Sequence, residues 1–583
     1  MSLVNLTING KSVSVPKGTT ILEAAKQLNI KIPSLCYLHM DDIDMINQCS
    51  SCRVCMVSCK KGLVPACGTV VKENMEIKTN TNEALKARKN VVELLLSDHP
   101  QDCLSCGKSG NCELQNIASD LGIRDIKFKG EVSKAPIDTS SKSIIKDHNK
   151  CILCRRCETM CNEIQTVGVL SGINRGFNTQ VGTFFNTKLC NTECTFCGQC
   201  IAVCPTGALS EVNNISTVWD ILNQSEKTIV VQVAPAVRVA IGEEFGLEAG
   251  SISTGKMVAA LRALGFTNVF DTNFGADLTI LEEASEFLHR FKEKQDLPML
   301  TSCCPAWINF IEHNYPNLLN LPSSCKSPQE MFGSIAKGYY APKVLKIKPK
   351  DMYVISIMPC VAKKYECSRR ELGQEDIPDV DVVITTRELA KMIKEAGIDL
   401  ANLEEEDFDS PLGNSSGAAD LFGATGGVLE AALRTAYEFI TEKELTDVNF
   451  TSVRGIEGLK EASIDIEGTI INVCIASSLG NARKIMDEVA TGKSKYHLIE
   501  IMACPGGCIG GGGQPYHNGD YDIVKKRSNG LYNIDSNKEL RKSHDNPDII
   551  ALYNAFLGEP YSEIAHKYLH THYFDKSIKY ILS

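Results

Sequence analysis

The sequence predicts a multidomain protein in which small, cysteine-rich α+β domains precede a larger α/β domain with two lobes. Three observations predict this class. The chain has 583 residues, enough for three to five domains, and 43% of them are hydrophobic. Most of its 26 cysteines stand in closely spaced groups before residue 216. After that point, apolar strand-like runs alternate with helix-like segments, which is typical of parallel sheets covered by helices.

Composition excludes several classes of partner. The 61 basic and 71 acidic residues give a net charge of -10, which argues against nucleic acid and against an anionic membrane surface. No apolar run approaches the length of a membrane span, and the first residues alternate like a strand and not like a signal peptide. We therefore expect a cytoplasmic protein.

The cysteines indicate metal chemistry. In a reducing cytoplasm they are expected to be thiols and not disulfides. Thiolates grouped in this way inside a long chain bind soft metals, as zinc sites or iron–sulfur clusters. Zinc sites usually come as one or two closed tetrahedra. So many cysteine groups in series therefore favour a series of iron–sulfur clusters that transfers electrons.

Residues 1–80 predict a hairpin, a helix and a cysteine-rich loop. Strands over 3–8 and 12–15 flank the turn signal Asn9-Gly10, and a helix follows Thr19 or Thr20. This order resembles the β-grasp fold of plant-type 2Fe-2S ferredoxins. Such a cluster takes one early cysteine, a CxxC pair and one distant cysteine, which favours Cys36, Cys52, Cys55 and Cys67. Cys49 with Cys52 is a rival pair, and otherwise Cys49 and Cys59 are interpreted as bystanders.

Residues 81–125 predict an amphipathic helix over 84–96 followed by a compact ligand group. The group consists of His99, Cys103, Cys106 and Cys112. Three thiolates and one imidazole fit zinc as well as iron, so chemistry alone leaves the metal open.

Residues 140–215 contain an internal repeat of the bacterial ferredoxin motif CxxCxxCxxxC. In this motif the fourth cysteine of each run binds the other cluster. One 4Fe-4S cluster is therefore predicted on Cys151, Cys154, Cys157 and Cys204, and a second on Cys194, Cys197, Cys200 and Cys161. Cys190 lies outside both runs and is interpreted as a spare thiol.

Residues 216–583 predict parallel sheets, with strands over 228–233, 352–357 and 469–475 and helices over 254–264, 282–292 and 389–396. Three cysteine-containing fragments lie at strand ends or in the loops that follow, where ligand sites of open α/β sheets form. Together they offer four thiolates for one cluster: Cys304, Cys360, Cys504 and Cys508. Cys303 would lie beside that cluster, because adjacent side chains point in different directions.

Those fragments carry a family resemblance. TSCCP, MPCxxKK and MACxGGCxxGGGQP resemble the three signature motifs of the FeFe hydrogenases, and the N-terminal half resembles that of the monomeric clostridial members. The resemblance implies reversible hydrogen chemistry at an H-cluster: a 4Fe-4S cube joined to a two-iron unit with CO, cyanide and a bridging dithiolate. It implies that HxxxCxxCxxxxxC binds a 4Fe-4S cluster through His99, which gives one 2Fe-2S and three accessory 4Fe-4S clusters.

The same resemblance implies roles around the H-cluster. Cys508 would be shared with the two-iron unit, and Lys363 would hydrogen-bond a cyanide. Pro235 and Ala236 fall where the family has Pro and often Ser, so one hydroxyl would be missing here. Further residues would shape the pocket: Gln329, Met358, Phe422, Gly423 and Met502.

Proton delivery is implied in the same way. Cys303 would be the last donor, with Glu283, Ser323 and Glu286 behind it and Arg290 holding the outer carboxylate. Cys325 and Cys367 lie outside the pattern. Cys325, two residues after Ser323, is interpreted as an inert buried thiol, with influence on the relay or a response to oxygen as the alternatives.

The family reading further implies ferredoxin or flavodoxin as electron partner and maturation proteins that build the two-iron unit. Three alternatives are a hydrogen sensor of the same fold, an iron–sulfur electron-transfer subunit and a cytosolic iron–sulfur assembly factor. The retained Cys303 and the three late motifs favour catalysis. The glycine-rich stretches 423–427 and 510–513 match neither GxGxxG nor a P-loop.

Overall fold

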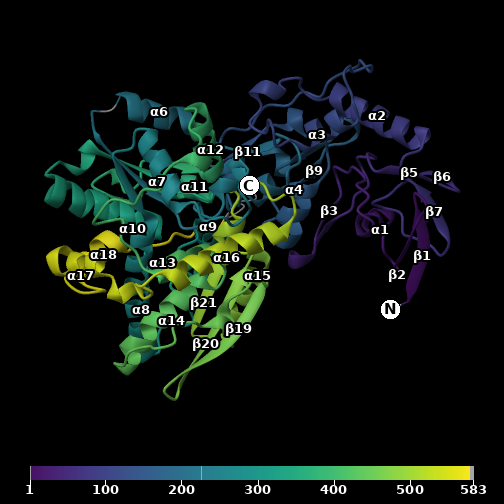
Figure 1. Ribbon diagram of the computed structural model, residues 1–583. Coiled ribbons are helices and arrows are strands. Elements are labelled where there is room, and N and C mark those ends of the chain that lie inside the picture. Colours follow the sequence, from purple (N-terminus) through teal and green to yellow (C-terminus); the bar gives the residue numbers. More distant parts are fainter. Residues whose placement is uncertain (1, 225, 578–583) are drawn as a thin grey trace, which may run out of the picture.

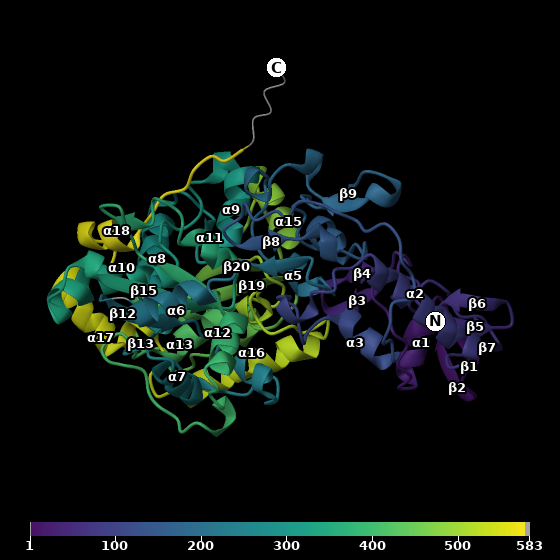
Figure 2. The same cartoon turned by 90° about the horizontal axis from the view of Figure 1, so that it is seen from above.

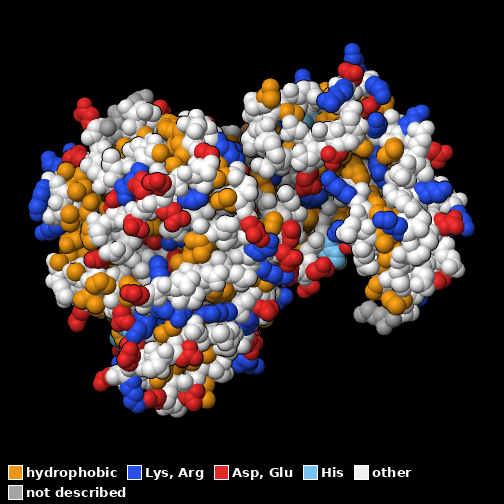
Figure 3. Space-filling model, viewed as in Figure 1, with side chains coloured by type: hydrophobic (Ala, Val, Ile, Leu, Met, Phe, Trp, Pro, Cys, Tyr) orange, Lys and Arg blue, Asp and Glu red, His pale blue; other side chains and the backbone are white. Residues whose placement is uncertain are grey.

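The computed structural model describes residues 2–224 and 226–577. Figure 1 shows the N-terminal sheet at the right, the larger C-terminal region (residues 216–577) at the left, and the segments that connect them at the top and in the middle. On the face drawn in Figure 3, acidic and basic side chains are interspersed. Among the described residues, no helix combines the length and the apolar composition that a membrane crossing requires.

The N-terminal unit is a five-stranded sheet in the order β2-β1-β7-β5-β6. Strand β1 (Leu3–Ile8) pairs antiparallel with β2 (Lys11–Pro16) and parallel with β7 (Met75–Lys78). Strands β5 (Met56–Cys59) and β6 (Gly62–Pro65) complete the sheet. Helix α1 (Ile21–Gln27) begins after Thr20, whose hydroxyl accepts a hydrogen bond from the backbone N–H of Glu23. The predicted hairpin and helix are confirmed.

A helical segment joins this sheet to the rest. Helix α2 (Asn82–Ser97) contains the predicted 84–96 helix and is capped by Thr81. It packs along β5, where Arg88 Nε donates to the backbone oxygen of Met56 at 2.8 Å. Helix α3 (Glu113–Asp120) follows. The short loop between the two helices carries the predicted His/Cys group.

The ferredoxin repeat appears in the backbone as well as in the sequence. Helices α4 (Arg156–Thr159) and α5 (Gln199–Val203) each begin within one cysteine run and contain its third cysteine, Cys157 or Cys200. Both runs use two left-handed residues in the turn, Leu153 and Arg155 in the first and Phe196 and Gly198 in the second. Strands β8 (Ile144–Lys146) and β11 (Leu209–Glu211) pair antiparallel and close the segment.

The C-terminal region contains two four-stranded sheets. The first is parallel in the order β13-β12-β15-β18, with bounds Asn268–Asp271, Thr228–Val233, Met352–Met358 and Val382–Thr385. The second has the order β14-β21-β20-β19, with bounds Met299–Leu300, Leu498–Met502, Thr469–Ser477 and Leu459–Ile466. The three predicted strands are thus confirmed, and one lobe forms around each sheet.

Helices α7 (Thr254–Ala263) and α12 (Thr386–Glu395) confirm two predicted helices. The third, α8 (Thr272–Glu293), begins ten residues before the predicted 282–292 segment. Its first residues are buried on all sides, with Phe274 and Leu278 in the core of the first sheet and Ala276 and Ile280 in the core of the second. A helix enclosed by both lobes has no polar stripe, so periodicity does not reveal it.

The C-terminal segment wraps around both lobes (Figure 1, Figure 2). Helix α16 (Tyr521–Asn537) lies across the middle, and α17 (Pro547–Leu552) and α18 (Glu563–Leu569) cover one side of the first lobe. Directly after α18, His570 forms an antiparallel bridge with Cys325.

Candidate cluster-binding sites and catalytic cavity

A buried cavity lies where strands of both sheets end. The segment after β12 supplies Pro235 and Ala236, and the segment after β14 supplies Cys303 and Cys304. The ends of β15 and β21 supply the remaining fragments, Met358–Cys360 and Met502–Cys504. Fragments that are far apart in the sequence therefore meet because carboxyl ends of strands share one edge of each sheet.

The four predicted cube ligands all line this cavity: Cys304, Cys360, Cys504 and Cys508. Burial raises the pKa of Cys508 to about 12, and burial together with Cys360 and Cys304 raises the pKa of Cys504 well above its ordinary value. So many thiolates are not stable together without positive charge between them. The donor set fits an iron–sulfur cube, whose irons supply that charge and bind thiolate sulfur.

Glycine lets the backbone close around the cavity at Gly507. Its φ is +94°, and a Cβ there would lie 2.7 Å from the backbone nitrogen of Thr425. Any other residue would both strain the chain and displace this contact. The glycine-rich run therefore packs backbone against backbone beside Cys508.

The residues predicted to shape the pocket are all in its wall: Pro235, Ala236, Gln329, Met358, Phe422, Gly423 and Met502. The wall is mainly apolar. Ala236 offers only its backbone oxygen, which accepts from Gln514 Nε2 at 2.8 Å. The missing hydroxyl predicted at this position is thus a feature of the pocket.

Lys363 is the cation of the cavity wall. Its Nζ lies 2.7 Å from Glu366 Oε2 and donates to the backbone oxygen of Cys303 at 3.2 Å. Burial alone would lower the pKa of Lys363, but the Glu366 carboxylate more than offsets this and raises it. Lys363 therefore stays positively charged, and its two hydrogen bonds hold the ammonium group in one orientation.

The inner part of the predicted proton relay lies on α8 and beside Cys303. Glu283 is buried, and the Ser302 hydroxyl lies 3.3 Å from its Oε1. The same hydroxyl is 2.7 Å from the backbone oxygen of Cys325, so its single proton alternates between two acceptors. Burial, reinforced by the charge of Glu286, raises the pKa of Glu283 to about 8.

The outer part is a continuous set of hydrogen bonds. Ser323 Oγ donates to Glu286 Oε2 at 2.7 Å, and Arg290 Nη2 lies 2.6 Å from Glu286 Oε1. Arg290 also donates to the backbone oxygen of Leu321 at 2.9 Å, and its side chain reaches the surface. Glu286, Ser323 and Arg290 therefore form one connected group that reaches solvent, whereas Glu283 makes its hydrogen bonds with Ser302.

The ferredoxin repeat encloses two further cavities. One is lined by Cys151, Cys154, Cys157 and Cys204, and the other by Cys161, Cys194, Cys197 and Cys200. This is the crossed arrangement that the repeat predicts. Burial raises the pKa of Cys157 and Cys200 well above the ordinary value for a thiol, as expected for ligands removed from water.

In the N-terminal unit, the four favoured 2Fe-2S ligands are buried: Cys36, Cys52, Cys55 and Cys67. Cys49 is exposed, and its thiol points to the backbone oxygen of Cys154 at 3.3 Å. Cys59 bonds the oxygen of Gly62 within the β5–β6 turn. Burial therefore favours the predicted set over the alternatives with Cys49 or Cys59.

The His/Cys group lies against the ferredoxin repeat. The backbone N–H of Glu113 donates to the oxygen of Pro205 at 2.9 Å, and a Cβ on Gly207 would lie 2.6 Å from Cys106 Sγ. His99 and its three cysteines thus lie in the connection between α2 and α3, and this donor set fits zinc as well as iron.

Polar side chains connect the sites in a definite order. Asn47 Nδ2 donates to the backbone oxygens of Cys36 and, at 3.0 Å, Cys154. Nearer the cavity, Asn309 Nδ2 donates to the oxygen of Cys194 at 2.9 Å, and Gln165 Nε2 donates to that of Ala503 at 3.0 Å. The ligand loops are therefore in contact from the N-terminal sheet to the catalytic cavity.

Sequence reasoning missed several residues of these networks: Ser302, Ser324, Glu282, Glu366 and His570. Each is an ordinary polar residue that acquires partners only through burial. The sole sequence signal was the i, i+3 spacing of Lys363 and Glu366, which places them on one helical face.

The fold and the site together define an oxidoreductase with a chain of iron–sulfur sites that ends at a buried catalytic cluster. The family described as "Iron only hydrogenase large subunit, C-terminal domain" matches residues 227–512, and "Iron hydrogenase small subunit" matches 521–576. A 2Fe-2S binding family matches residues 2–82. Two NADH-quinone oxidoreductase iron–sulfur families match 88–127 and 141–210.

Individual relatives agree. The NADP-reducing hydrogenase subunit HndD of Solidesulfovibrio fructosivorans is 55% identical over 99% of this chain and 100% of its own length. Iron hydrogenase 1 of Clostridium pasteurianum is 40% identical over 97% of this chain and 99% of its own. A solved structure of the [FeFe]-hydrogenase HydA1 from Chlamydomonas reinhardtii is 43% identical, with a TM-score of 0.56 over 63% of this chain and 100% of that one. The chain belongs to the FeFe hydrogenase family.

Proposed function

We propose that the chain catalyses the reversible reaction of two protons and two electrons to hydrogen, at an H-cluster held by Cys304, Cys360, Cys504 and Cys508. The observation that carries this proposal is the cavity itself. Four thiols from the segments after three strands, β14, β15 and β21, line it, with the free thiol Cys303 and the cation Lys363 in its wall. When bound, the two-iron unit supplies the metal at which the H–H bond is made or broken.

The residues around the cavity orient and insulate that centre. Lys363, held by Glu366, directs a charged N–H into the cavity toward an anionic ligand. Met358, Met502 and Phe422 exclude water. Cys508 tethers the two-iron unit, so the remaining control comes from these surrounding side chains.

Protons move through Cys303, Glu283, Ser323 and Glu286. Cys303 presents its S–H in the cavity wall and is the last donor. Glu283, with a pKa of about 8, is protonated at neutral pH and restores the proton on Cys303. Ser323 and Glu286 pass protons inward from the surface, where Arg290 fixes the outer carboxylate.

The ligand sets named above would hold one 2Fe-2S and three 4Fe-4S accessory clusters, which would supply a path for electrons. The hydrogen bonds of Asn47 and Asn309 support the order from the 2Fe-2S site through the two ferredoxin clusters to the cube. The His99 site joins the same line from the side, because it contacts the loop of Cys204. One imidazole in place of a thiolate removes negative charge and raises the potential of that cluster.

The electron partner we propose is ferredoxin or flavodoxin, in the cytoplasm. A second candidate is a nucleotide-dependent partner subunit, because one relative is named an NADP-reducing hydrogenase subunit. The glycine-rich stretches of this chain match neither GxGxxG nor a P-loop, so this candidate places the nucleotide on another polypeptide. Assays of the purified chain with reduced ferredoxin and with NADPH separate the two.

The decisive test combines infrared spectroscopy and hydrogen evolution on one anaerobic, maturated sample. Bands of metal-bound CO and cyanide together with turnover support the proposal. CO and cyanide bands without turnover indicate a sensor. A correctly maturated sample without such bands excludes an H-cluster and leaves an electron-transfer protein.

A further inference from the structure

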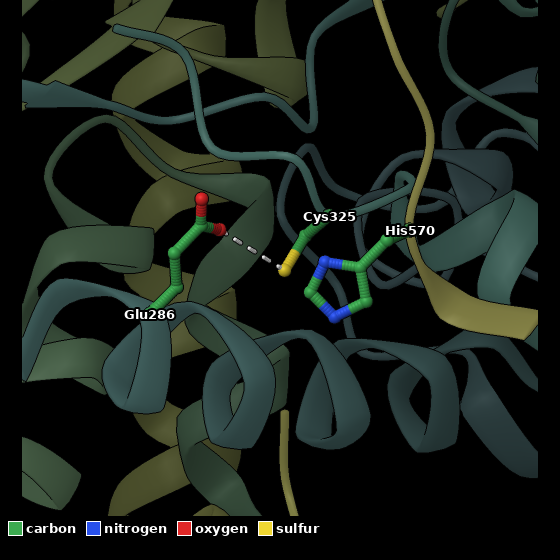
Figure 4. A group of neighbouring side chains, drawn as sticks. All are labelled: Glu286, Cys325 and His570. Carbon is green, nitrogen blue, oxygen red and sulfur yellow. Dashed lines mark hydrogen bonds between the residues drawn. The ribbon is translucent and has the colours of Figure 1, made fainter. Parts of the chain in front are cut away.

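Three side chains outside the four accessory cluster sites and the cavity form a compact group: Glu286, Cys325 and His570, the first of which also belongs to the proposed outer relay. They come from α8, from the segment before α10 (Pro328–Ile335) and from the segment after α18. One ligand atom of each lies within 4.8 Å of the other two, and all three residues are buried. Figure 4 shows the Cys325 sulfur between the Glu286 carboxylate and the His570 ring.

We propose that these three residues bind one divalent transition-metal ion of the zinc type, and that the bound ion blocks the outer proton relay. Carboxylate oxygen, thiolate sulfur and imidazole nitrogen are the donors that zinc takes in proteins. The blocking effect rests on the function proposed above, whereas the binding does not.

The first support is the geometry of the donors. Cys325 Sγ and Glu286 Oε2 are 3.8 Å apart. With Zn–S near 2.3 Å and Zn–O near 2.0 Å, sulfur and oxygen on a tetrahedral ion lie about 3.5 Å apart. This pair therefore needs to move by only a few tenths of an ångström.

The second support is a backbone bridge that holds two donors opposite each other. Cys325 and His570 are direct partners in an antiparallel bridge. The bridge is flanked by hydrogen bonds from Lys326 N to Leu569 O at 2.8 Å and from Thr571 N to Ser324 O at 2.7 Å. Directly opposite residues hold their side chains on the same side at close range, so little order has to be created on binding.

The third support is a carboxylate behind the histidine. His570 Nε2 lies 3.0 Å from Glu282 Oε2, which leaves Nδ1 facing Cys325 and Glu286. Metal-bound histidines usually donate their other ring N–H to such a carboxylate. Glu282 is itself fixed by the Tyr553 hydroxyl and by the backbone N–H of Tyr561 at 2.8 Å. The groups that would hold a metal-bound His570 in place are therefore already hydrogen-bonded to one another.

The fourth support is a further oxygen and a nearby histidine. Ser324 Oγ lies 2.7 Å from His570 Nδ1 and 3.2 Å from Glu286 Oε1, where it completes a tetrahedral set or yields its place to water. The ring of exposed His566 stacks on His570 with centroids 4.2 Å apart. The histidine of the site is therefore one ring away from a residue that is open to solvent.

Binding exchanges a proton for the ion. The Cys325 S–H bond breaks, a Zn–S bond forms, and the thiol proton leaves to solvent, with no change in oxidation state. Burial and the nearby carboxylates raise the pKa of this thiol, so the ion has to displace a firmly held proton. Glu286 then uses an oxygen for the metal that otherwise accepts the Ser323 proton.

The test uses the full-length, cluster-loaded protein under anaerobic conditions, with zinc alone as the probe. Zinc K-edge X-ray absorption reports the zinc ligands separately from iron. We expect one sulfur near 2.3 Å together with nitrogen and oxygen near 2.0 Å. Cys325→Ala should lose the sulfur shell, and Cys474→Ala, which removes a buried thiol from β20, should keep it. A zinc spectrum without sulfur, or one unchanged in Cys325→Ala, overturns the site.

The positioning role of Glu282 gives a second readout. Glu282→Gln should weaken zinc binding about 10- to 100-fold in a calorimetric titration, since it removes the carboxylate behind His570. An unchanged affinity contradicts the proposed arrangement. This result does not depend on hydrogen turnover, so it stands whether or not the proposed function does.

Inhibition is tested on the same samples. Each variant is compared with its own zinc-free hydrogen-evolution rate. Zinc should reduce that rate in the unmodified chain and in Cys474→Ala at concentrations that leave Cys325→Ala unaffected. Sulfur-bound zinc without inhibition overturns the blocking role, and equal inhibition of all three proteins places the inhibitory ion elsewhere.

Discussion

The electron side and the proton side of the catalytic cavity are built in opposite ways. On the electron side, each ferredoxin cavity takes three of its four cysteines from one short run of sequence. On the proton side, Glu286, Ser323 and Ser324 meet from distant segments, and Ser302 reaches Glu283 only through the fold. Electron transfer needs special ligands, which are local, whereas proton transfer needs ordinary groups whose value comes from burial and geometry.

The largest expected effect is on the proton side. Cys303→Ala should lower hydrogen evolution about 10²- to 10⁴-fold, because it removes the proposed last proton donor, which lies in the cavity wall. Infrared bands of CO and cyanide should persist, since Cys303 is not among the four cube ligands. Cys474→Ala serves as the control for losing a buried thiol. A hydrogen-evolution rate close to that of Cys474→Ala would contradict the prediction, because it would show that protons reach the cavity without Cys303.

A ligand variant on the electron side should behave differently. Cys200→Ala should lose about four irons and strongly reduce turnover with an external electron carrier. Exchange of hydrogen isotopes with solvent should remain, because it needs the proton relay and the cavity but no net flow of electrons. Loss of both activities would mean that the two sides are not separable.

The pKa of Glu283 gives an effect of intermediate size. Its folded value of about 8 lies above the unfolded value of 4.5, so the folded chain binds more protons between these limits. The stability linked to Glu283 is present below pH 4.5 and is lost as the pH rises through 8. Relative to Glu283→Gln, the unmodified chain should therefore lose a few kcal/mol between pH 5 and pH 9, at about 1.4 kcal/mol per unit of pKa shift.

Thermal melting of the two proteins across this range measures the difference. Ser210→Ala, a change on β11 far along the chain from α8, provides a reference for general effects of pH. If the melting temperatures of Glu283→Gln and of the unmodified chain change with pH in the same way, Glu283 keeps an ordinary pKa.

The smallest effect concerns the contact between accessory sites. Asn47→Ala removes the donor shared by the carbonyls of Cys36 and Cys154, which costs about 1–3 kcal/mol if both stay buried and unpaired. We expect a lower melting temperature and easier loss of the 2Fe-2S signal by electron paramagnetic resonance, with the infrared bands intact. Asn223→Ala, at an exposed position of α6 (Ile215–Gln224), is the matched asparagine control.

These contrasts explain what the sequence could predict. The hairpin, the strands that end at the cavity and the crossed cysteine repeat follow from local pattern and spacing, because each signal lies within a few residues. The first half of α8 could not be predicted from the sequence, because a helix that is enclosed by two lobes has no periodic change between apolar and polar residues. The contact between Ser324 and His570 could not be predicted either, because no local pattern relates residues that are 246 positions apart.

The favoured 2Fe-2S set illustrates a middle case. Spacing alone left Cys49 as a rival, and the structure separates the candidates by burial: Cys36 and Cys52 are enclosed, whereas Cys49 is exposed. A motif defines which residues are available, and packing decides which are removed from water.

The wrapped C-terminal segment has a consequence for dilute conditions. Residues 521–576 match a family described as a hydrogenase small subunit, yet here they continue the same polypeptide as the large-subunit match. A tethered segment has a high effective concentration at its docking surface, which a separate chain has only when its own concentration is high. His570 thus remains beside Glu286 however few molecules are present, and the outer end of the relay keeps its neighbour without depending on subunit assembly.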